Sequence, residues 1–427
     1  MIRQTTTSAS PAPVPAVPQE ALLPSVPLLA LDRQHAALRE QIRAAIDRVV
    51  DSGRFVLGPD VNDLEAELAR ALDVPHAISC ASGSDALLLA LMALGVSAGD
   101  EVVVPSYTFF ATASAVTRLG AVPIFADIDP RTYLVDPTDV ERKISRRCKA
   151  IVPVHLFGRT ADMDALLPIA KRAGVPVVED AAQSILSTWH GRCSGALGDV
   201  GCFSFYPTKN LGGIGDGGFL TTTRDDIAKS LKLLRVHGME PRYYHQLIGI
   251  NSRLDSIQAA VLRVKLPHLD AWSTARQVNA ARYGELFAAA DLAGCVTVPD
   301  EEPRGRHVWN QYIVRIAAGQ RDALRAHLAA HGVGSEIYYP VPLHVQQCFE
   351  HLGWRTGDLP HTEQAAAETL ALPIFPELTA AEQRTVVARI AEFFHASRPA
   401  ATIPAVETLR GPHFLRRAVG KADEVRS

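Results

Sequence analysis

Residues 198–218 read GDVGCFSFYPTKNLGGIGDGG, and they decide the fold more than any other part of the 427-residue chain. They predict a buried strand, VGCFSFY, then a loop that holds Lys209, then a glycine-rich turn that leads into a second strand, GFLTTT. Taken alone, Lys209 is most simply a solvated surface lysine, but beside backbone that can approach a ligand closely it is a candidate Schiff-base nucleophile. Gly213, Gly215 and Gly218 match a dinucleotide-binding pattern, but the strand that follows them replaces the helix that such a site needs.

Seven apolar segments of strand length, including the two beside this loop, alternate with helical patterns. Their apolar runs are continuous, which is typical of strands that are buried on both faces. We therefore expect an α/β fold, with a mostly parallel seven-stranded sheet in a three-layer large domain. The seven segments are residues 77–82, 101–107, 122–128, 150–157, 176–182, 200–206 and 218–223.

The pattern changes beyond Val296. A strand at 307–316, a helix closed by Gly332 and a final segment at 380–396, AAEQRTVVARIAEFFHA, fit a smaller α+β domain. The predicted organisation is a disordered Pro/Ala-rich tail at 1–26, a large cofactor-binding α/β domain at 27–270, a small C-terminal α+β domain at 271–396 and a C-terminal tail at 397–427.

Composition excludes several classes of partner. With 43 Lys and Arg against 46 Asp and Glu, the net charge is −3, so no positive field indicates a nucleic-acid or anionic-membrane partner. The longest apolar run, residues 86–94, is far shorter than the roughly 20 residues that span a bilayer, and the N-terminus lacks the pattern of a secretion signal. The six cysteines form no C-x-x-C pair, so we expect free thiols, no metal site and a reducing, cytoplasmic location.

Polar or aromatic groups follow three further predicted strands, at the sheet edge where ligands collect. Residues 82–85, SGSD, open an apolar helix and can hold a phosphate, although a simple N-cap is the alternative. Glu179 and Asp180 end a buried strand, where a carboxylate needs a cation such as a protonated pyridine nitrogen, or else a structural ion pair. Residues 105–110, PSYTFF, offer a ring face unless they are core. With Lys209, these are the parts of a pyridoxal 5′-phosphate (PLP) site.

Several ordered blocks resemble the DegT/DnrJ/EryC1/StrS family of PLP-dependent nucleotide-sugar aminotransferases, which are fold-type I, aspartate aminotransferase-like enzymes. The resemblance extends over roughly residues 27–395. Its blocks include RFVLGPDVNDLEAELARAL, ASGSDALLLAL, VVEDAAQS, GDVGCFSFYPTKNLGGIGDGG, GINSRLDSIQAAVL and YYPVPLHVQ.

The resemblance implies a role for each candidate site residue. Lys209 would bind the cofactor covalently and later move a proton between the substrate carbon and the cofactor. Asp180 would pair with the pyridine nitrogen. The other implied cofactor contacts are Gln183 beside the phenolic oxygen, Phe109 on the ring, Gly83, Ser84 and Ser204 at the phosphate, and Asn251 from the second subunit of a homodimer with shared active sites.

The resemblance also implies the substrates. Some branches of the family replace the lysine with histidine and act as dehydratases, so Lys209 favours transamination. L-glutamate would give its amino group to the cofactor, and a keto sugar on a nucleoside diphosphate would accept it. Local cations, Arg253 or Arg33, should meet the diphosphate. His237, Tyr338 and His344 are candidate sugar contacts, and each is equally well explained as structural.

A short motif indicates which carbon of the sugar receives the amino group. KNLG followed by GDGG resembles the family members that aminate C3, whereas many C4 enzymes carry a TT-GEGG version, so we expect a 3-keto hexose. A C4 nucleotide-sugar aminotransferase or a cyclitol-type aminotransferase is the nearest alternative. An alternative of another class is a non-catalytic PLP-binding regulatory protein.

Overall fold

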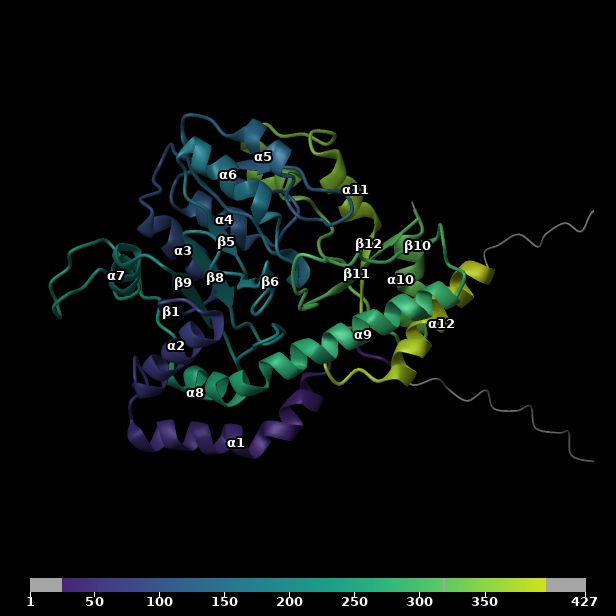
Figure 1. The fold of residues 1–427 in the computed structure, drawn as a ribbon, viewed down its shortest axis with the longest axis horizontal. Helices are drawn as coiled ribbons and strands as arrows, with labels where there is room; N and C mark the ends of the chain where they lie inside the picture. Colours follow the sequence, from purple (N-terminus) through teal and green to yellow (C-terminus); the bar gives the residue numbers. More distant parts are fainter. Residues whose placement is uncertain (1–24, 318, 397–427) are drawn as a thin grey trace, which may run out of the picture.

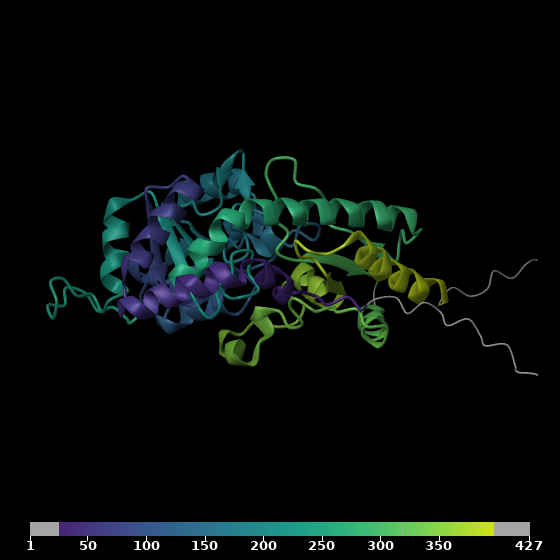
Figure 2. The same cartoon turned by 90° about the horizontal axis from the view of Figure 1, so that it is seen from below.

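The computed structural model describes residues 25–317 and 319–396. The predicted tails at 1–26 and 397–427 therefore lie outside the described residues, apart from residues 25 and 26. Among the described residues, no helix is long and apolar enough to cross a membrane. Figures 1 and 2 show helices packed around a central sheet region, with a second, smaller group of helices and strands at one end.

All seven predicted apolar segments form strands, but they divide between two sheets. The four-stranded sheet has the order β1 (His76–Cys80), β9 (Gly218–Thr222), β8 (Val200–Ser204), β5 (Val178–Asp180). The three-stranded sheet has the order β3 (Val122–Ala126), β2 (Glu101–Pro105), β4 (Cys148–Ile151). The expected single sheet is thus two ladders, which isolated parallel bridges join at Ile151–Val177 and Val154–Asp180.

Strand direction explains where polar side chains gather. The pairs β2–β3, β2–β4 and β5–β8 are parallel, whereas β9 is antiparallel to both β1 and β8. Parallel neighbours place their carboxyl ends at one edge of the sheet, and that edge is where loops carry ligand-binding groups. The segments that follow β2, β5 and β8 therefore converge.

Helices bury both faces of the four-stranded sheet. Alternate side chains of β8 point to opposite faces: Cys202 joins the hydrophobic cluster of α3 (Gly83–Ala93) and α7 (Asp225–Leu234), while Phe203 joins the cluster of α2 (Pro59–Leu72) and α8 (Ser256–Lys265). Both side chains are buried, which explains the continuous apolar pattern of this strand. The remaining helices of this part are α1 (Leu31–Ser52), α4 (Ala111–Arg118), α5 (Pro137–Lys143) and α6 (Met163–Ala173).

A separate hydrophobic cluster forms the core of the C-terminal part. It surrounds a small antiparallel sheet and draws in Val26 and Ala30 from the beginning of the described chain. The long helix α9 (Leu269–Ala289), green in Figures 1 and 2, extends from the end of α8 into this cluster. The other elements are β10 (Val296–Thr297), β11 (Tyr312–Ile316), β12 (Thr369–Leu372), α10 (Arg321–Ala330), α11 (Pro360–Glu368) and α12 (Ala380–Ala396).

Candidate active site

A cavity of about 610 Å³ lies where the carboxyl ends of the strands meet the C-terminal part. Its walls come from the start of α3, the loops after β2, β5 and β8, and residues 338 and 339. Eight of the eleven side chains or glycines predicted for the site line this one cavity. They are Gly83, Ser84, Phe109, Asp180, Gln183, Ser204, Lys209 and Tyr338.

Asp180 is the buried acid of the cavity. It ends β5 and is 5% exposed. Its Oδ2 accepts a hydrogen bond from Thr112 Oγ1 at 2.8 Å, and its Oδ1 accepts one from the Ala182 amide at 3.2 Å. Burial raises the pKa of this carboxyl, and the Thr112 hydrogen bond opposes that rise. A cation placed in the cavity would favour the charged form, as a protonated pyridine nitrogen requires.

Glu179, the neighbouring acid, has a different environment because successive side chains on a strand point to opposite faces. It is fully buried and accepts hydrogen bonds from the amides of Gly195, Leu197 and Gly198, at 2.6–2.8 Å. His155 Nε2 lies 2.8 Å from the same carboxylate. Glu179 therefore has a structural role, which leaves Asp180 as the acid that lines the cavity.

Lys209 lies in the loop after β8, and its amine is in the same cavity as Asp180. Burial lowers the pKa of Lys209 to about 8, and the charge of Asp180 opposes this shift. The loop is held by the next residue: Asn210 donates to the Val308 carbonyl at 2.9 Å and accepts a hydrogen bond from Asn310 at 2.8 Å. Lysine nucleophiles need such a lowered pKa, because only the neutral amine attacks a carbonyl.

The start of α3 has the features of a phosphate cradle. Ser82 is the N-cap and accepts a hydrogen bond from the Asp85 amide at 3.1 Å, and the first amides of the helix point toward the cavity edge. A Cβ atom at Gly83 would lie 2.7 Å from Ser204 Cβ, so only glycine lets the helix approach the end of β8 this closely. The resulting gap is bounded by the hydroxyls of Ser84 and Ser204.

Gln183 and two aromatic rings form the opposite wall. Gln183 Oε1 accepts a hydrogen bond from the Phe157 amide at 2.6 Å, and Gln183 Nε2 donates to the Tyr339 hydroxyl at 3.1 Å. The Phe109 ring is 56% exposed and lies 6.1 Å from the Tyr339 ring. An aromatic ring with an open face toward a cavity can stack on a planar ligand.

Three predicted site residues do not line the cavity of their own chain. Asn251 and His237 are exposed at the two ends of a loop that projects from the body beyond α7 (Figures 1 and 2). His344 is buried, with its Nδ1 2.7 Å from Ser106 Oγ. The two arginines predicted for the diphosphate do not line it either, and Arg33 pairs with Glu382 at 2.6 Å.

Comparison with known proteins gives the family. Residues 36–391 match the model of the DegT/DnrJ/EryC1/StrS aminotransferase family. The chain belongs to this family. Its enzymes use PLP as their cofactor, and the buried acid, the amine and the glycine-lined cradle of the cavity fit that group.

Similar proteins carry both enzymatic and regulatory names. A pleiotropic regulatory protein of Geobacillus stearothermophilus is 48% identical over 87% of this chain and 99% of its own length. A UDP-N-acetyl-3-dehydro-alpha-D-glucosamine 3-aminotransferase of Acidithiobacillus ferrooxidans is 42% identical over 86% of this chain and 96% of its own length. The crystal structure of S. venezuelae DesV in complex with a ketimine intermediate is 42% identical in sequence, covers 88% of this chain and 100% of that chain, and superposes with a TM-score of 0.84.

Two residues that hydrogen-bond to side chains of the cavity were missed by sequence reasoning, and of the two Tyr339 also lines the cavity itself. Thr112 binds the cavity acid from α4, and Tyr339 binds Gln183 from the C-terminal part. Both lie in or beside blocks that carried the family resemblance, TFFATASAV and YYPVPLHVQ, but a hydroxyl on a helix or a second tyrosine has no distinctive pattern. Only the packing of the elements shows what they contact.

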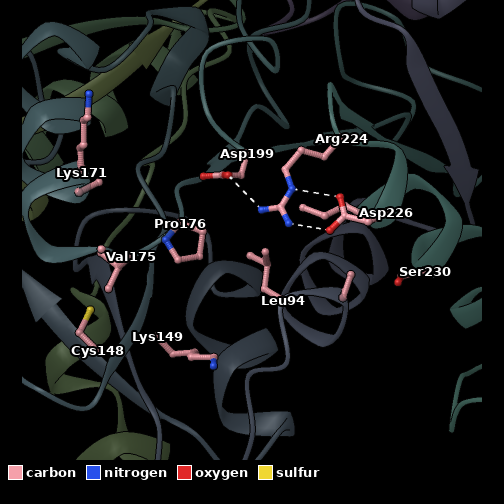
Figure 3. Close-up of a pocket in the computed structure, with 14 residues that line it drawn as sticks. Leu94, Cys148, Lys149, Lys171, Val175, Pro176, Asp199, Arg224, Asp226 and Ser230 are labelled. Carbon is pink, nitrogen blue, oxygen red and sulfur yellow. Dashed lines mark hydrogen bonds and ion pairs between the residues drawn. The ribbon is translucent and has the colours of Figure 1, made fainter.

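A second cavity, of about 540 Å³, lies far from this chemistry at the amino-terminal side of the strands (Figure 3). Arg224 in its wall pairs with Asp226 at 2.6 Å and lies 3.7 Å from Asp199. These two carboxylates neutralise the guanidinium. Arg224 is therefore not a free cation for an anionic ligand in the second cavity.

Proposed function

We propose that this family member transfers an amino group from L-glutamate to a nucleoside-diphosphate-linked keto sugar, at C3 of the hexose. The observation that carries the proposal is the pairing of a lysine of lowered pKa with a buried carboxylate in one cavity, beside a helix start able to hold a phosphate. A relative whose name places its reaction at the 3-position, and the KNLG and GDGG motifs, support C3.

Seven residues of the cavity have a defined role in this proposal. Bound PLP supplies an electron sink that stabilises negative charge on the substrate carbon. Asp180 accepts a hydrogen bond from the pyridinium nitrogen and keeps that nitrogen protonated. Lys209 Nζ would take the proton from the carbon of the amino donor and deliver it to the cofactor, and would move a proton in the opposite direction when the keto sugar is aminated. Gly83, Ser84 and Ser204 hold the phosphate, Phe109 covers the ring, and Gln183 contacts the phenolic oxygen.

Three features of the assembly belong to the same proposal. We infer a homodimer in which the projecting loop brings Asn251 to the phosphate of the partner's site, because Asn251 is exposed and outside the cavity of its own chain. His237 would reach the sugar by the same route, whereas Tyr338 lines the cavity of its own chain. His344 is buried outside that cavity between Ser106 and Glu363, which fits its structural interpretation. We also infer a cytoplasmic location, which suits six cysteines that are all free.

The finer description of the fold is also proposed. We infer that the two ladders act as one seven-stranded platform, because parallel bridges join them where β4 and β5 meet. We further infer a large domain at 27–270 and a small domain at 271–396, since a separate hydrophobic cluster forms the core of most of the C-terminal part. Two segments cross this division: Val26 and Ala30 pack in the C-terminal cluster, and Leu343, Phe349 and Leu359 pack in the main cluster.

The test is to incubate the purified protein with L-glutamate and then with a set of 3-keto and 4-keto nucleotide sugars, and to locate the new amino group by NMR. Amination of a 3-keto sugar alone is expected. Amination at C4 would show that the proposed position is wrong. The absence of turnover with every amino donor would favour the regulatory role that the Geobacillus protein's name describes.

The assignment of Lys209 has its own control. In Lys209→Ala, borohydride should no longer fix the cofactor to the protein, while the circular dichroism spectrum stays that of the wild type. Lys265→Ala is the matched control, and in this variant borohydride should still fix the cofactor. Lys265 is also a buried lysine with a pKa lowered to about 8, but it donates to the Gly212 carbonyl behind the loop. Fixation of the cofactor that survives Lys209→Ala would contradict the assignment.

A further inference from the structure

Three side chains with metal-binding atoms meet in the C-terminal part, outside the PLP cavity. His327 lies in the last turn of α10, His331 caps that helix, and Glu392 lies on α12. One ligand atom from each lies within 4.8 Å of the other two. Two histidines at i and i+4 face the same side of a helix, a spacing that many zinc sites use.

The hydrogen bond that His331 makes leaves one of its ring nitrogens free to bind a metal ion. Its Nδ1 lies 2.8 Å from the His327 carbonyl oxygen, and because a carbonyl only accepts, Nδ1 carries the proton. Nε2 is then left with a free lone pair. This arrangement, with one ring nitrogen donating to a backbone carbonyl, is how metal-binding histidines are usually oriented.

His327 has a buried nitrogen that nothing in the described residues satisfies. Its Nε2 is inaccessible to solvent and has no hydrogen-bond partner. The His327 and His331 rings lie 4.2 Å apart, with a Phe393 contact on the His327 ring at 5.6 Å. Buried polar atoms are rarely left without a partner, so this nitrogen requires an explanation. The dipole of α10 accounts for histidines near its C-terminus but not for the unpaired Nε2.

Glu392 completes the group from the other helix. Arg389 Nη1 donates to one carboxylate oxygen at 2.7 Å, which leaves the second oxygen available as a ligand. Tetrahedral zinc holds nitrogen and oxygen ligands at about 2.0–2.2 Å, so two bound atoms lie roughly 3.3–3.6 Å apart. His331 and Glu392 are exposed, so a change of their side-chain rotamers can bring ligand atoms that now lie within 4.8 Å of one another to that separation.

We propose that His327, His331 and Glu392 bind a divalent transition-metal ion of the zinc class and that this ion joins α10 to α12. Two imidazoles and one carboxylate suit Zn²⁺, and three protein ligands leave one position for water. The ion would satisfy the buried His327 Nε2. It would also tie the end of α10 to α12, whose apolar sides share the core of the C-terminal part.

The test uses tag-free, PLP-loaded protein, freed of metal with a chelator and titrated with ZnCl₂ by calorimetry. The wild type should bind one zinc ion per chain at this site, and zinc should raise its melting temperature. His331→Ala and Glu392→Gln should each weaken binding at least about tenfold, as loss of one ligand from three predicts, and His331→Ala should abolish the rise in melting temperature.

His351→Ala is the matched control, since His351 is another exposed histidine of the C-terminal part. It should bind zinc as the wild type does. Equal zinc affinity in the wild type and in His331→Ala, with both proteins folded by circular dichroism, would overturn the proposal. So would an equal loss in His351→Ala, because zinc would then bind surface imidazoles in general.

Discussion

At the scale of single residues, the neighbouring acids Glu179 and Asp180 have different roles: Glu179 is structural, and Asp180 lines the cavity. The carboxylate of Glu179 is saturated by three amides and an imidazole, whereas that of Asp180 receives one hydroxyl and one amide and faces the cavity. The apolar strand predicted that two acids emerge together. Which acid points into the cavity depends on the register of β5 with β8, which the sequence pattern does not reveal.

Asp180→Asn should lower turnover at least about 100-fold, because the amide carries no charge to hold the pyridine nitrogen protonated. Lys209 should still bind the cofactor, so borohydride fixation should persist. Steady-state kinetics of both half-reactions measure the loss. Thr112→Val is the graded control: it removes one hydrogen bond from Asp180 but keeps the charge, and its loss should be much smaller. Similar losses in the two variants would argue against a charge effect.

The lowered pKa of Lys209 predicts the pH dependence of cofactor uptake by the protein without PLP. With a pKa of about 8, roughly a tenth of the amine is neutral at pH 7. An ordinary lysine, with a pKa near 10.4, would be neutral to less than about one part in a thousand. Uptake, followed by cofactor absorbance, should rise with pH and level off above about pH 8. A rise that continues to pH 10 would show that burial does not lower this pKa.

At the scale of elements, the start of α3 joins stability to ligand binding. Ser82 closes β1 and caps α3, and the leucines of that helix are buried in the main core. The sequence predicted this strand-to-helix junction because an apolar strand, a capping serine and an apolar helix follow one another directly. The same cap leaves the first amides of α3 available to a phosphate.

Ser82→Ala should lower the free energy of unfolding by about 1 kcal/mol, since the Asp85 amide loses its acceptor at 3.1 Å. Urea denaturation of the protein without cofactor measures this directly. Ser82→Thr keeps a capping hydroxyl and is expected to stay near the wild-type value. If threonine destabilises as much as alanine, the hydroxyl cap does not account for the loss.

Other elements were harder to predict from the sequence. The hairpin of β6 (Thr188–Trp189) and β7 (Arg192–Cys193) has only two residues per strand, too few for a period to show. β12 follows α11 with no intervening loop and was not predicted either. By contrast, α10 was predicted over 321–332 and forms Arg321–Ala330, because its apolar residues recur with a helical period and Gly332 marks its end. Long periodic segments are predictable, whereas short pairings depend on their neighbours.

At the scale of the whole molecule, most of the apolar surface of the loop beyond α7 is not covered by any other residue of 25–317 and 319–396, the part of the chain that the structure describes. Ile248 is 95% exposed, and Tyr243 and Tyr244 are more than two-thirds exposed. Exposed apolar groups gathered on one projection mark an interaction surface. The family resemblance led to the expectation of a shared site, and the exposure of this loop is the physical sign that supports it.

Shared sites predict that two inactive variants restore each other. A mixed dimer of Lys209→Ala and Asn251→Ala has one site with both residues intact. Co-expression with random pairing should therefore regain about a quarter of wild-type activity at limiting PLP. Size-exclusion chromatography of the variants checks that both remain dimers. If the mixture is no more active than its parts, Asn251 does not act across the interface.

The position of β9 has a consequence for how the protein is made. β9 lies between β1 and β8, yet it is the last of the three to be synthesised, more than 130 residues after β1. Until the ribosome has released residues 218–222, β1 has no ladder partner and the leucines of α3 lack one of the strands that cover them. Domains begin to fold from the N-terminus during synthesis, so this nascent chain carries an unpaired strand while residues 81–217 are made, about a third of the 427-residue chain. Chaperone binding to ribosome-bound chains should therefore begin at α3 and end once β9 emerges.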